Sequence, residues 1–410
     1  MVNFVLKRDG RKVKFEKDKI IKAISKAGFV ADEVKEKIAT EIGNLNREVI
    51  SIEDIQDLVE KKLMATSYKD VAKEYVRYRY LHKLAREKYV SLIDAITEKI
   101  DANNLQNQNA NVDEASFGGR VGEASDILMK TYALDFCVSN KTKSNHLNNE
   151  IYIHDLGSYA IGNHNCLSIP FDDLLANGFN TRQTDVRPAQ SINTAFQLVA
   201  VIFQLQSLQQ FGGVSATHLD WTMIPYVRFS FAKHYADGMK YLRGYEGEDY
   251  GNLDKDFIRN TSINDKFWTS DKAVYNYAMD MTVKETCQAV EGMYHNLNTL
   301  QSRSGNQLPF TSVNFGTCTL VEGRMVIKAL LEMAIKGVGK FHKTSIFPCT
   351  IFQCMKGVNR KTGDPNYDLF LLSLKSTSLR LYPNYANVDW SGNAGYDRNN
   401  PKTYFSTMGK

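Results

Sequence analysis

The hydrophobic pattern of the first 90 residues predicts a short hairpin followed by four helices. Two runs in which apolar and polar residues alternate flank Asp9-Gly10, and Asp-Gly in that setting is a strong hairpin signal. Apolar residues then recur every three or four positions, as they do on the buried side of a helix. The predicted helices cover residues 17–28, 32–43, 52–65 and 68–88, the third with Ser51 as its N-cap. These elements predict a compact α+β unit.

Beyond residue 122 the pattern changes to long helices that alternate with short strands. Helices are predicted over 123–137, 189–212 and 271–299, and strands over 151–154, 166–169, 311–315 and 346–353. Residues 192–207 are apolar nearly all round, which predicts a helix buried in a large core or in a subunit interface. The alternation is typical of an α/β fold with a central sheet or barrel.

A polar stretch separates these two regions. Residues 102–111 are rich in Asn and Gln and almost free of large apolar side chains. With the glycine-containing residues up to Gly122, they are interpreted as a loop or linker. We therefore expect an N-terminal domain over residues 1–92, a linker over 93–122 and a larger domain over 123–410.

Net charge also distinguishes the two regions. Residues 1–90 carry 21 Lys or Arg and 15 Asp or Glu, a formal charge of +6, whereas the remainder carries −1. The excess includes Lys7, Arg8 and Arg11 beside the predicted turn and Lys19 at the start of the first helix. Such cations suit a polyanionic ligand, for example a nucleotide triphosphate, but a solvated basic edge strand explains them equally well. The local charge argues against a nucleic-acid surface over the whole protein.

Composition argues against several classes of protein. The sequence has no run of about 18 apolar residues, so no membrane span is expected. The N-terminus lacks the apolar segment of a signal peptide, so a cytoplasmic location is expected. Six cysteines in 410 residues are too few for a disulfide scaffold. Cys349 and Cys354 have no second pair to complete a zinc site, so we expect buried thiols there and no metal site in this chain.

Four short clusters contain residues that could carry chemistry. His154-Asp155 ends a predicted strand and is either an orienting pair or a capped turn. Cys166 leads into another strand and is either a redox or radical thiol or an inert core cysteine. Asn314 lies near the end of a strand that runs into a glycine turn, a usual place for substrate contacts. Residues 404–410 predict a partly apolar strand at the terminus, which suggests a truncated chain.

Taken together, these motifs resemble the anaerobic (class III) ribonucleoside-triphosphate reductases, which are glycyl-radical enzymes. The N-terminal region resembles the ATP-cone of reductases at residues 7–11, 15, 19–20, 52–55 and 71–79. The larger region resembles the catalytic subunit at residues 152–156, 165–172, 187–188, 309–317 and 404–409. The motifs follow the family's order along nearly the whole chain.

The resemblance implies an α/β fold with an α+β ATP-cone, followed by part of a ten-stranded α/β barrel of the glycyl-radical type. In the ATP-cone, it implies that ATP or dATP binds with Mg²⁺ as an allosteric effector. The residues that would contact this effector are Lys7, Arg8, Arg11 and Lys19.

The resemblance also implies roles for four residues of the larger region. Cys166 matches the cysteine proposed to donate a hydrogen atom to the ribose 2′ position. His154 and Asn314 match positions near the substrate. Met408 would neighbour a radical thiol on a loop that enters the barrel.

The sequence departs from the family at that loop. In the family a radical cysteine directly follows a Ser-Thr-Met-Gly stretch, whereas here Ser406–Gly409 is followed by Lys410. We therefore expect a truncated or split reductase that is inactive in nucleotide reduction by itself. A C-terminal companion chain would then carry the rest of the barrel, the zinc site and the glycyl radical.

Ligands and partners follow from the same resemblance. The substrates would be ribonucleoside triphosphates, reduced with formate or a thiol carrier after activation by a radical-SAM iron–sulfur enzyme. The helix over 192–207 matches a dimer interface at which dNTP effectors bind, so a homodimer is expected.

Two alternatives stay open. A nucleotide-sensing regulator without catalysis is disfavoured by the presence of Cys166, and a pyruvate formate-lyase type of enzyme is disfavoured by the ATP-cone.

Overall fold

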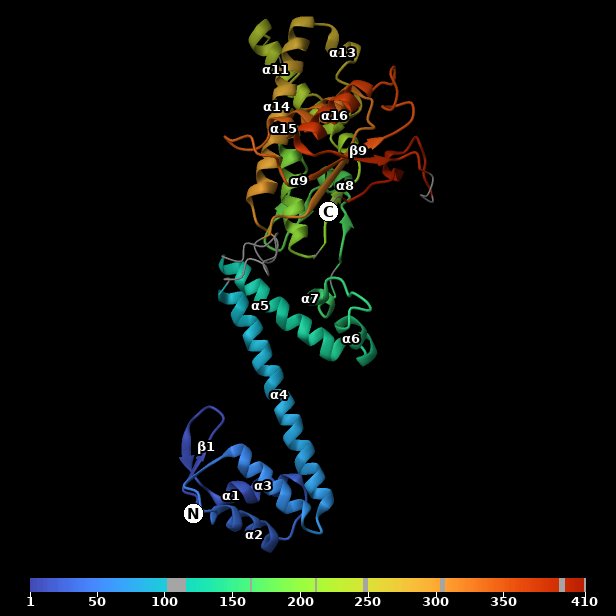
Figure 1. Cartoon of the computed structure of the whole chain (residues 1–410). Helices are drawn as coiled ribbons and strands as arrows, with labels where there is room; N and C mark the ends of the chain where they lie inside the picture. The colour runs from blue at the N-terminus through green and yellow to red at the C-terminus, as the bar shows by residue number, and fades with distance from the viewer. Residues whose placement is uncertain are drawn as a thin grey trace. The chain divides into compact units, whose positions relative to one another are not determined.

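The protein is represented by a computed structural model that describes the chain except residues 102–115, 163, 211, 246–249, 303–306, 391–394 and 409–410. The chain divides into two compact units, Met1–Thr97 and Glu98–Lys410 (Figure 1). The Asn- and Gln-rich stretch over 102–111 and the last two residues of the predicted terminal strand lie outside the described residues.

The first unit is a small sheet with helices packed against it. β1 (Phe4–Leu6) pairs antiparallel with β2 (Lys12–Lys14) and parallel with β3 (Val49–Ser51), which gives the strand order β2-β1-β3. The predicted hairpin is confirmed, and its turn places Gly10 at φ +79°, a conformation that glycine adopts without strain. The helices are α1 (Lys17–Ala27), α2 (Asp32–Gly43), α3 (Ile52–Met64) and α4 (Lys69–Asp101).

The four helices confirm the predicted apolar spacing. Ile20 and Ile24 of α1 are buried, as are Val59 and Leu63 of α3, because each pair lies one turn apart on the same helix face. Ser51 caps α3 as predicted, since its Oγ accepts a hydrogen bond from the Asp54 amide at 3.0 Å. The fourth helix is longer than predicted and continues to Asp101.

The second unit contains a parallel sheet of five strands. In space the strands follow the order β10-β9-β8-β7-β4, and each pairs parallel with its neighbour. Their bounds are β4 (Leu167–Ser168), β7 (Val214–Ala216), β8 (Thr311–Phe315), β9 (Cys349–Cys354) and β10 (Asn384–Asn387). A separate two-stranded ribbon pairs β5 (Phe179–Asn180) with β6 (Asp185–Val186). The α/β class is as predicted.

The helices of the second unit range from single turns to a 28-residue helix. They are α5 (Phe117–Tyr132), α6 (Asn140–Leu147), α7 (Leu156–Tyr159), α8 (Phe171–Asn177), α9 (Ile192–Ser207), α10 (Leu219–Thr222), α11 (Ile224–Arg243), α12 (Lys255–Asn260), α13 (Lys266–Thr269), α14 (Lys272–Thr299), α15 (Val321–Lys336) and α16 (Tyr367–Arg380). No helix among the described residues is both long enough and apolar enough to cross a membrane.

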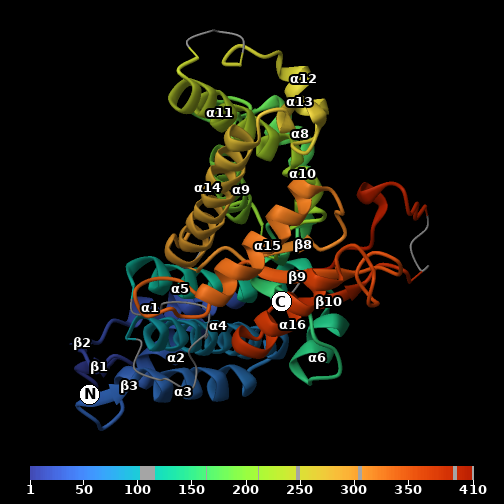
Figure 2. The ribbon, with the colours of Figure 1, turned by 90° about the horizontal axis from the view of Figure 1, so that it is seen from above.

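One face of the five-stranded sheet is apolar and packs against helices. Val214, Val313 and Phe352 on this face share a core with residues of α9, α14 and α15. Helices α9 and α14 run side by side in both views (Figures 1 and 2). The apolar helix over 192–207 was predicted to be buried in a core or in a subunit interface, and Phe196 and Phe203 of α9 are fully buried in the core of its own unit.

Three predicted segments differ from the structure. Residues 151–154 form no strand, because the chain turns at Asp155 (φ +54°) into α7. The described part of 404–410 also forms no strand, and a 3-10 turn over Pro401–Thr403 precedes it. The linker predicted over 93–122 is helical at both ends, since α4 reaches Asp101 and α5 begins at Phe117.

Candidate functional site

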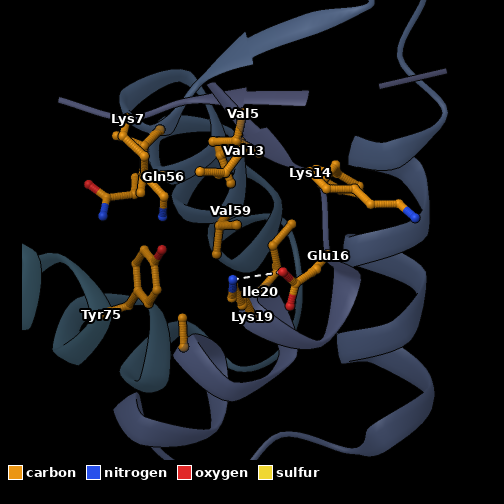
Figure 3. A pocket seen from close by; sticks show the side chains of 14 residues that line it. Val5, Lys7, Val13, Lys14, Glu16, Lys19, Ile20, Gln56, Val59 and Tyr75 are labelled. Carbon is orange, nitrogen blue, oxygen red and sulfur yellow. Dashed lines mark hydrogen bonds and ion pairs between the residues drawn. The ribbon is translucent and has the colours of Figure 1, made fainter. Parts of the chain in front are cut away.

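A pocket in the first unit brings together two of the four predicted effector contacts, Lys7 and Lys19. Apolar side chains from β1, β2, α1 and α3 form much of its wall, and they include Val5, Val13, Ile20, Ile55 and Val59. The polar residues that line it are Lys7, Lys14, Glu16, Lys19, Gln56 and Tyr75 (Figure 3). An apolar wall beside lysines can hold a ligand that combines a flat ring with an anionic group.

The charged groups of this pocket are partly paired. Lys19 Nζ lies 2.8 Å from Glu16 Oε1, and this contact lowers the pKa of Glu16. In Figure 3 the Lys14 side chain points away from the other labelled side chains. Burial raises the pKa of Tyr75 to about 12, so its phenol remains protonated and can donate a hydrogen bond at neutral pH. Lys14, Glu16, Gln56 and Tyr75 were not predicted as site residues, because the local pattern gave no sign that they converge.

The other two predicted cations contact acidic residues and do not line the pocket. Arg8 Nε lies 2.5 Å from Glu53 Oε1, and its Nη2 donates to Gln56 Oε1 at 3.1 Å. Arg11 folds back on Asp9 within the hairpin turn, at 2.6 Å between Nη2 and Oδ2. The hydrogen bond from the Arg11 side chain is the largest cause of the lowered pKa of Asp9.

A second hollow adjoins the first and is lined by residues of α4. Tyr78, Arg79, His82 and Arg86 contribute to it, and it shares Tyr75 with the first pocket. The Arg79 guanidinium is surrounded by carboxylates of α3, at 2.5 Å from Asp57 and 3.2 Å from Glu53 and Glu60. Ion pairs therefore connect α4 to α3 beside the two hollows.

A second candidate site lies on the polar face of the sheet in the second unit. Because side chains alternate along a strand, the residues between the apolar core positions face the other way. Those residues are Ser215 of β7, Asn314 of β8 and Gln353 of β9, and each is buried. Parallel strands covered on both faces are usually apolar throughout, so three neighbouring polar side chains mark this face as a place where specific hydrogen bonds form.

The segment that precedes Met408 lies across this polar face. Asn314 Nδ2 donates to the Thr407 carbonyl at 3.0 Å, and the Thr407 amide donates back to Asn314 Oδ1 at 3.1 Å. Gln353 Nε2 donates to the Phe405 carbonyl at 3.0 Å. The structure therefore brings Asn314 to the main chain beside Met408.

Cys166 lies near the opposite end of the same sheet. It precedes β4, whose Leu167 pairs with Val214, which in turn pairs with Thr311. Asn314 is thus four register positions beyond the level of Cys166, or roughly 13 Å along the strands. The Cys166 thiol is 3.6 Å from Asn165 Oδ1 and is partly exposed. The described structure does not bring these two predicted residues into contact.

His154 lies in a different setting. Its Nδ1 is 2.7 Å from Asp155 Oδ1, and its ring meets Tyr152 edge-on at 6.2 Å between centroids. Both partners belong to its own segment, and the His154 side chain is 64% exposed. His154 therefore contacts its own segment, and Asp155, the residue before α7, makes no side-chain capping hydrogen bond.

A polar cluster that sequence reasoning missed joins α8 to the end of β7. Asp172 Oδ2 lies 3.1 Å from His218 Nε2 and 3.2 Å from Lys402 Nζ, and Asp172 Oδ1 accepts from the Thr222 hydroxyl at 2.6 Å. Burial of Asp172 opposes its ionisation, but these contacts outweigh burial and lower its pKa well below the usual range. Asp172 belongs to residues 165–172, which carry part of the resemblance. Its partners are distant in the sequence, so the local pattern did not predict the cluster.

A buried carboxylate fixes the turn that follows Asn314. Asp220 Oδ2 accepts main-chain hydrogen bonds from Gly316, Thr317 and Cys318 at 2.9–3.0 Å. Burial raises the pKa of Asp220, and the bonds from Cys318 and Gly316 oppose that rise. The described residues contain no group of three or more His, Cys, Asp or Glu that could hold a metal ion.

Comparison with known proteins identifies the family. Residues 108–409 match the family described as anaerobic ribonucleoside-triphosphate reductase, and residues 3–84 match the ATP cone domain. The chain belongs to the anaerobic ribonucleoside-triphosphate reductase family. The matched ATP cone contains the whole pocket of the first unit, and the matched reductase region contains the polar face of the sheet.

Individual relatives agree with the family match. The chain is 32% identical over 402 residues to the anaerobic ribonucleoside-triphosphate reductase of Haemophilus influenzae and 30% identical over 398 residues to that of Escherichia coli. Each alignment covers 95% of this chain but 53% and 52% of the relative, so the chain spans about half the length of the curated relatives it matches.

Among solved structures, the chain aligns with the anaerobic ribonucleotide reductase from Thermotoga maritima in complex with dATP and CTP. That alignment covers 77% of this chain and 50% of the other, at 14% identity and a TM-score of 0.47.

Proposed function

We propose that the first unit binds ATP or dATP in its pocket as an allosteric effector. The observation that carries this proposal is the convergence of Lys7 and Lys19, from the hairpin and from α1, on one pocket with an apolar wall. Lysines bind phosphate as point charges, and the apolar wall suits a base or ribose. The protonated Tyr75 hydroxyl adds a donor, and Mg²⁺ would enter with the triphosphate rather than through a cluster of protein ligands.

For the second unit we propose a part in the anaerobic reduction of ribonucleoside triphosphates. Membership of the reductase family and the presence of Cys166 support a catalytic rather than purely regulatory chain. In this proposal Cys166 donates hydrogen to the ribose, and Asn314 holds the main-chain segment that leads to Met408. His154 would lie near the substrate, as the resemblance implies.

The wider reaction is proposed on the same basis. It would use formate or a thiol as reductant and a radical-SAM activating enzyme, and dNTP effectors would bind at a homodimer interface that includes α9. A nucleotide-sensing regulator is the alternative outcome if the pocket binds ATP but no reaction can be reconstituted.

Calorimetric titration of the 410-residue chain with ATP and dATP tests the effector site. Lys19→Met is expected to weaken binding about tenfold or more, because a charge-assisted contact to phosphate contributes roughly 1.5–3 kcal/mol. Lys17→Met is the matched control, since Lys17 lies on the same helix and its Nζ donates to Thr40 Oγ1 at 3.3 Å. Equal losses in both variants, or no loss in Lys19→Met, would contradict the proposed site.

Turnover is measured separately. The chain is incubated anaerobically with the activating enzyme, ribonucleoside triphosphate, and formate or a thiol, and the deoxyribonucleotide product is quantified. The sequence-based expectation is that the 410 residues form no product by themselves. Product that disappears in Cys166→Ser would overturn that expectation and support the assigned role of Cys166.

A further inference from the structure

The side-chain amide of Asn314 is already occupied by protein. Its Nδ2 lies 3.0 Å from the carbonyl oxygens of both Ala216 and Thr407 and 3.1 Å from Ser215 Oγ, and its Oδ1 accepts from the Thr407 amide. An amide nitrogen has two hydrogens, so these acceptors already exceed the available donors. Asn314 is also fully buried. A residue in this state has no donor left for a substrate hydroxyl.

Gln353 makes a similar contact two residues earlier in the same segment. Its Nε2 donates to the carbonyl of Phe405 at 3.0 Å and to that of Thr217 at 3.3 Å, and the side chain is fully buried. In an extended segment, main-chain groups of alternate residues point the same way. Asn314 and Gln353 therefore bind residues 407 and 405 as a neighbouring strand would, but with side chains.

A charged contact holds the start of this segment. Lys402 Nζ lies 3.2 Å from Asp172 Oδ2, and Asp172 is itself fixed by His218 and Thr222. Lys402 is 62% exposed, so this ion pair is screened and contributes less than the two buried amides. The segment over 402–407 is thus held at three points, by Asp172 of α8, Asn314 of β8 and Gln353 of β9.

We propose that Asn314 and Gln353 are positioning residues, which clamp the main chain of residues 405–407 across the polar face of the sheet and so fix where Met408 stands. Asn314 then acts through Thr407 and does not bind substrate. This assignment revises the expectation from sequence, in which Asn314 contacts substrate. The purpose of the clamp, to fix Met408 in place, rests on the proposed function. The hydrogen bonds of the clamp are tested without nucleotide and without a turnover assay.

Hydrogen exchange of the 410-residue chain, followed by mass spectrometry, tests the clamp. Asn314→Leu keeps the approximate side-chain volume and removes both bonds to Thr407. We expect exchange in peptides covering 404–408 to accelerate at least tenfold. Asn366→Leu is the matched control, because Asn366 is an equally buried amide that donates to the carbonyls of Gly316 and Cys318. It should leave 404–408 protected.

Asn314→Asp adds a pH-dependent signature. A protonated carboxyl has one donor and can keep one of the bonds that the amide makes, whereas a carboxylate offers acceptors alone and repels the Thr407 and Ala216 carbonyls. The protection factor of 404–408 should therefore fall in this variant as the pH rises through the pKa of the new carboxyl. Wild-type protein should show no such transition.

Gln353→Met keeps the proposal testable if Asn314→Leu does not fold. It removes the bond to Phe405, and it should also accelerate exchange at 404–408. Unchanged exchange at 404–408 in the folded variants would overturn the proposal. So would a variant of Asn314 that keeps full protection there and loses affinity for ribonucleoside triphosphate, because that result would return Asn314 to substrate binding.

Discussion

Arg8 donates to Glu53 across 2.5 Å, so a residue predicted to bind phosphate is held by a carboxylate of α3. The same carboxylate lies 3.2 Å from Arg79 on α4 through its second oxygen. Glu53 therefore links the hairpin to α4, and the contact from Arg8 is the largest cause of its lowered pKa. If the proposed effector binds within reach of Arg8, its phosphates would compete with Glu53 for Arg8, and binding would then be coupled to the α3–α4 contact.

Glu53→Gln is expected to tighten ATP binding by about two- to fivefold at low salt. The substitution releases Arg8 and removes a negative charge that opposes the phosphates, and exposed ion pairs of this kind contribute about 0.2–1 kcal/mol. Calorimetry at two ionic strengths measures the effect, which should shrink at high salt. Glu74→Gln is the control, since Glu74 pairs with Arg77 on the outer side of α4 at 3.6 Å. Weaker binding by Glu53→Gln would count against competition for Arg8.

Asp172 makes part of the stability of the second unit dependent on pH. Because its folded pKa is depressed, its contribution is present above the unfolded pKa of about 3.9 and is lost as the pH falls further. Asp172→Asn should cost about 1–3 kcal/mol at pH 7. The difference in Tm between the two proteins should then narrow as the pH falls below about 4.

Thermal unfolding from pH 7 to pH 3 checks this expectation. Asp173→Asn serves as control, because Asp173 is the next residue of α8 and is exposed. Parallel Tm curves for wild type and Asp172→Asn across the whole range would show that the contacts to His218 and Lys402 do not stabilise the ionised carboxyl.

Two glycines of the second unit should respond to alanine in opposite ways. A Cβ on Gly212 would lie 1.6 Å from the main-chain oxygen of Asn165, so the segment that carries Cys166 would have to move. We expect Gly212→Ala to cost more than about 2 kcal/mol and to change the rate at which Cys166 reacts with a thiol reagent. A Cβ on Gly292 in α14 would meet open space, so Gly292→Ala should stabilise the unit by about 0.5–1 kcal/mol.

Denaturant titration and mass spectrometry of the alkylated thiol provide these measurements. A Gly212→Ala protein with unchanged stability and unchanged Cys166 reactivity would show that the backbone at residue 165 relaxes without cost. Loss of stability in both variants would instead point to a general intolerance of the unit to added methyl groups.

Features that depend on neighbours in sequence were predictable. Asp9-Gly10 sets the hairpin because its backbone preferences are local, and Ser51 caps α3 because the Asp54 amide is three residues away. The repeat of apolar residues located α1–α3 for the same reason. The motifs around Cys166 and Asn314 were sufficient for the resemblance to the reductase family, which the family match over 108–409 confirms.

Features that depend on contacts between distant segments were decided by the tertiary structure. Asn314 meets Thr407 across 93 residues of sequence, and the partly apolar pattern of 404–410, which predicted a strand, gave no sign of this side-chain contact. Arg8 contacts Glu53, which lies on another element, instead of lining the pocket. Strand register placed Cys166 and Asn314 at opposite ends of one sheet. Periodicity determines which side of an element is buried, but the packing of elements determines which side chains meet.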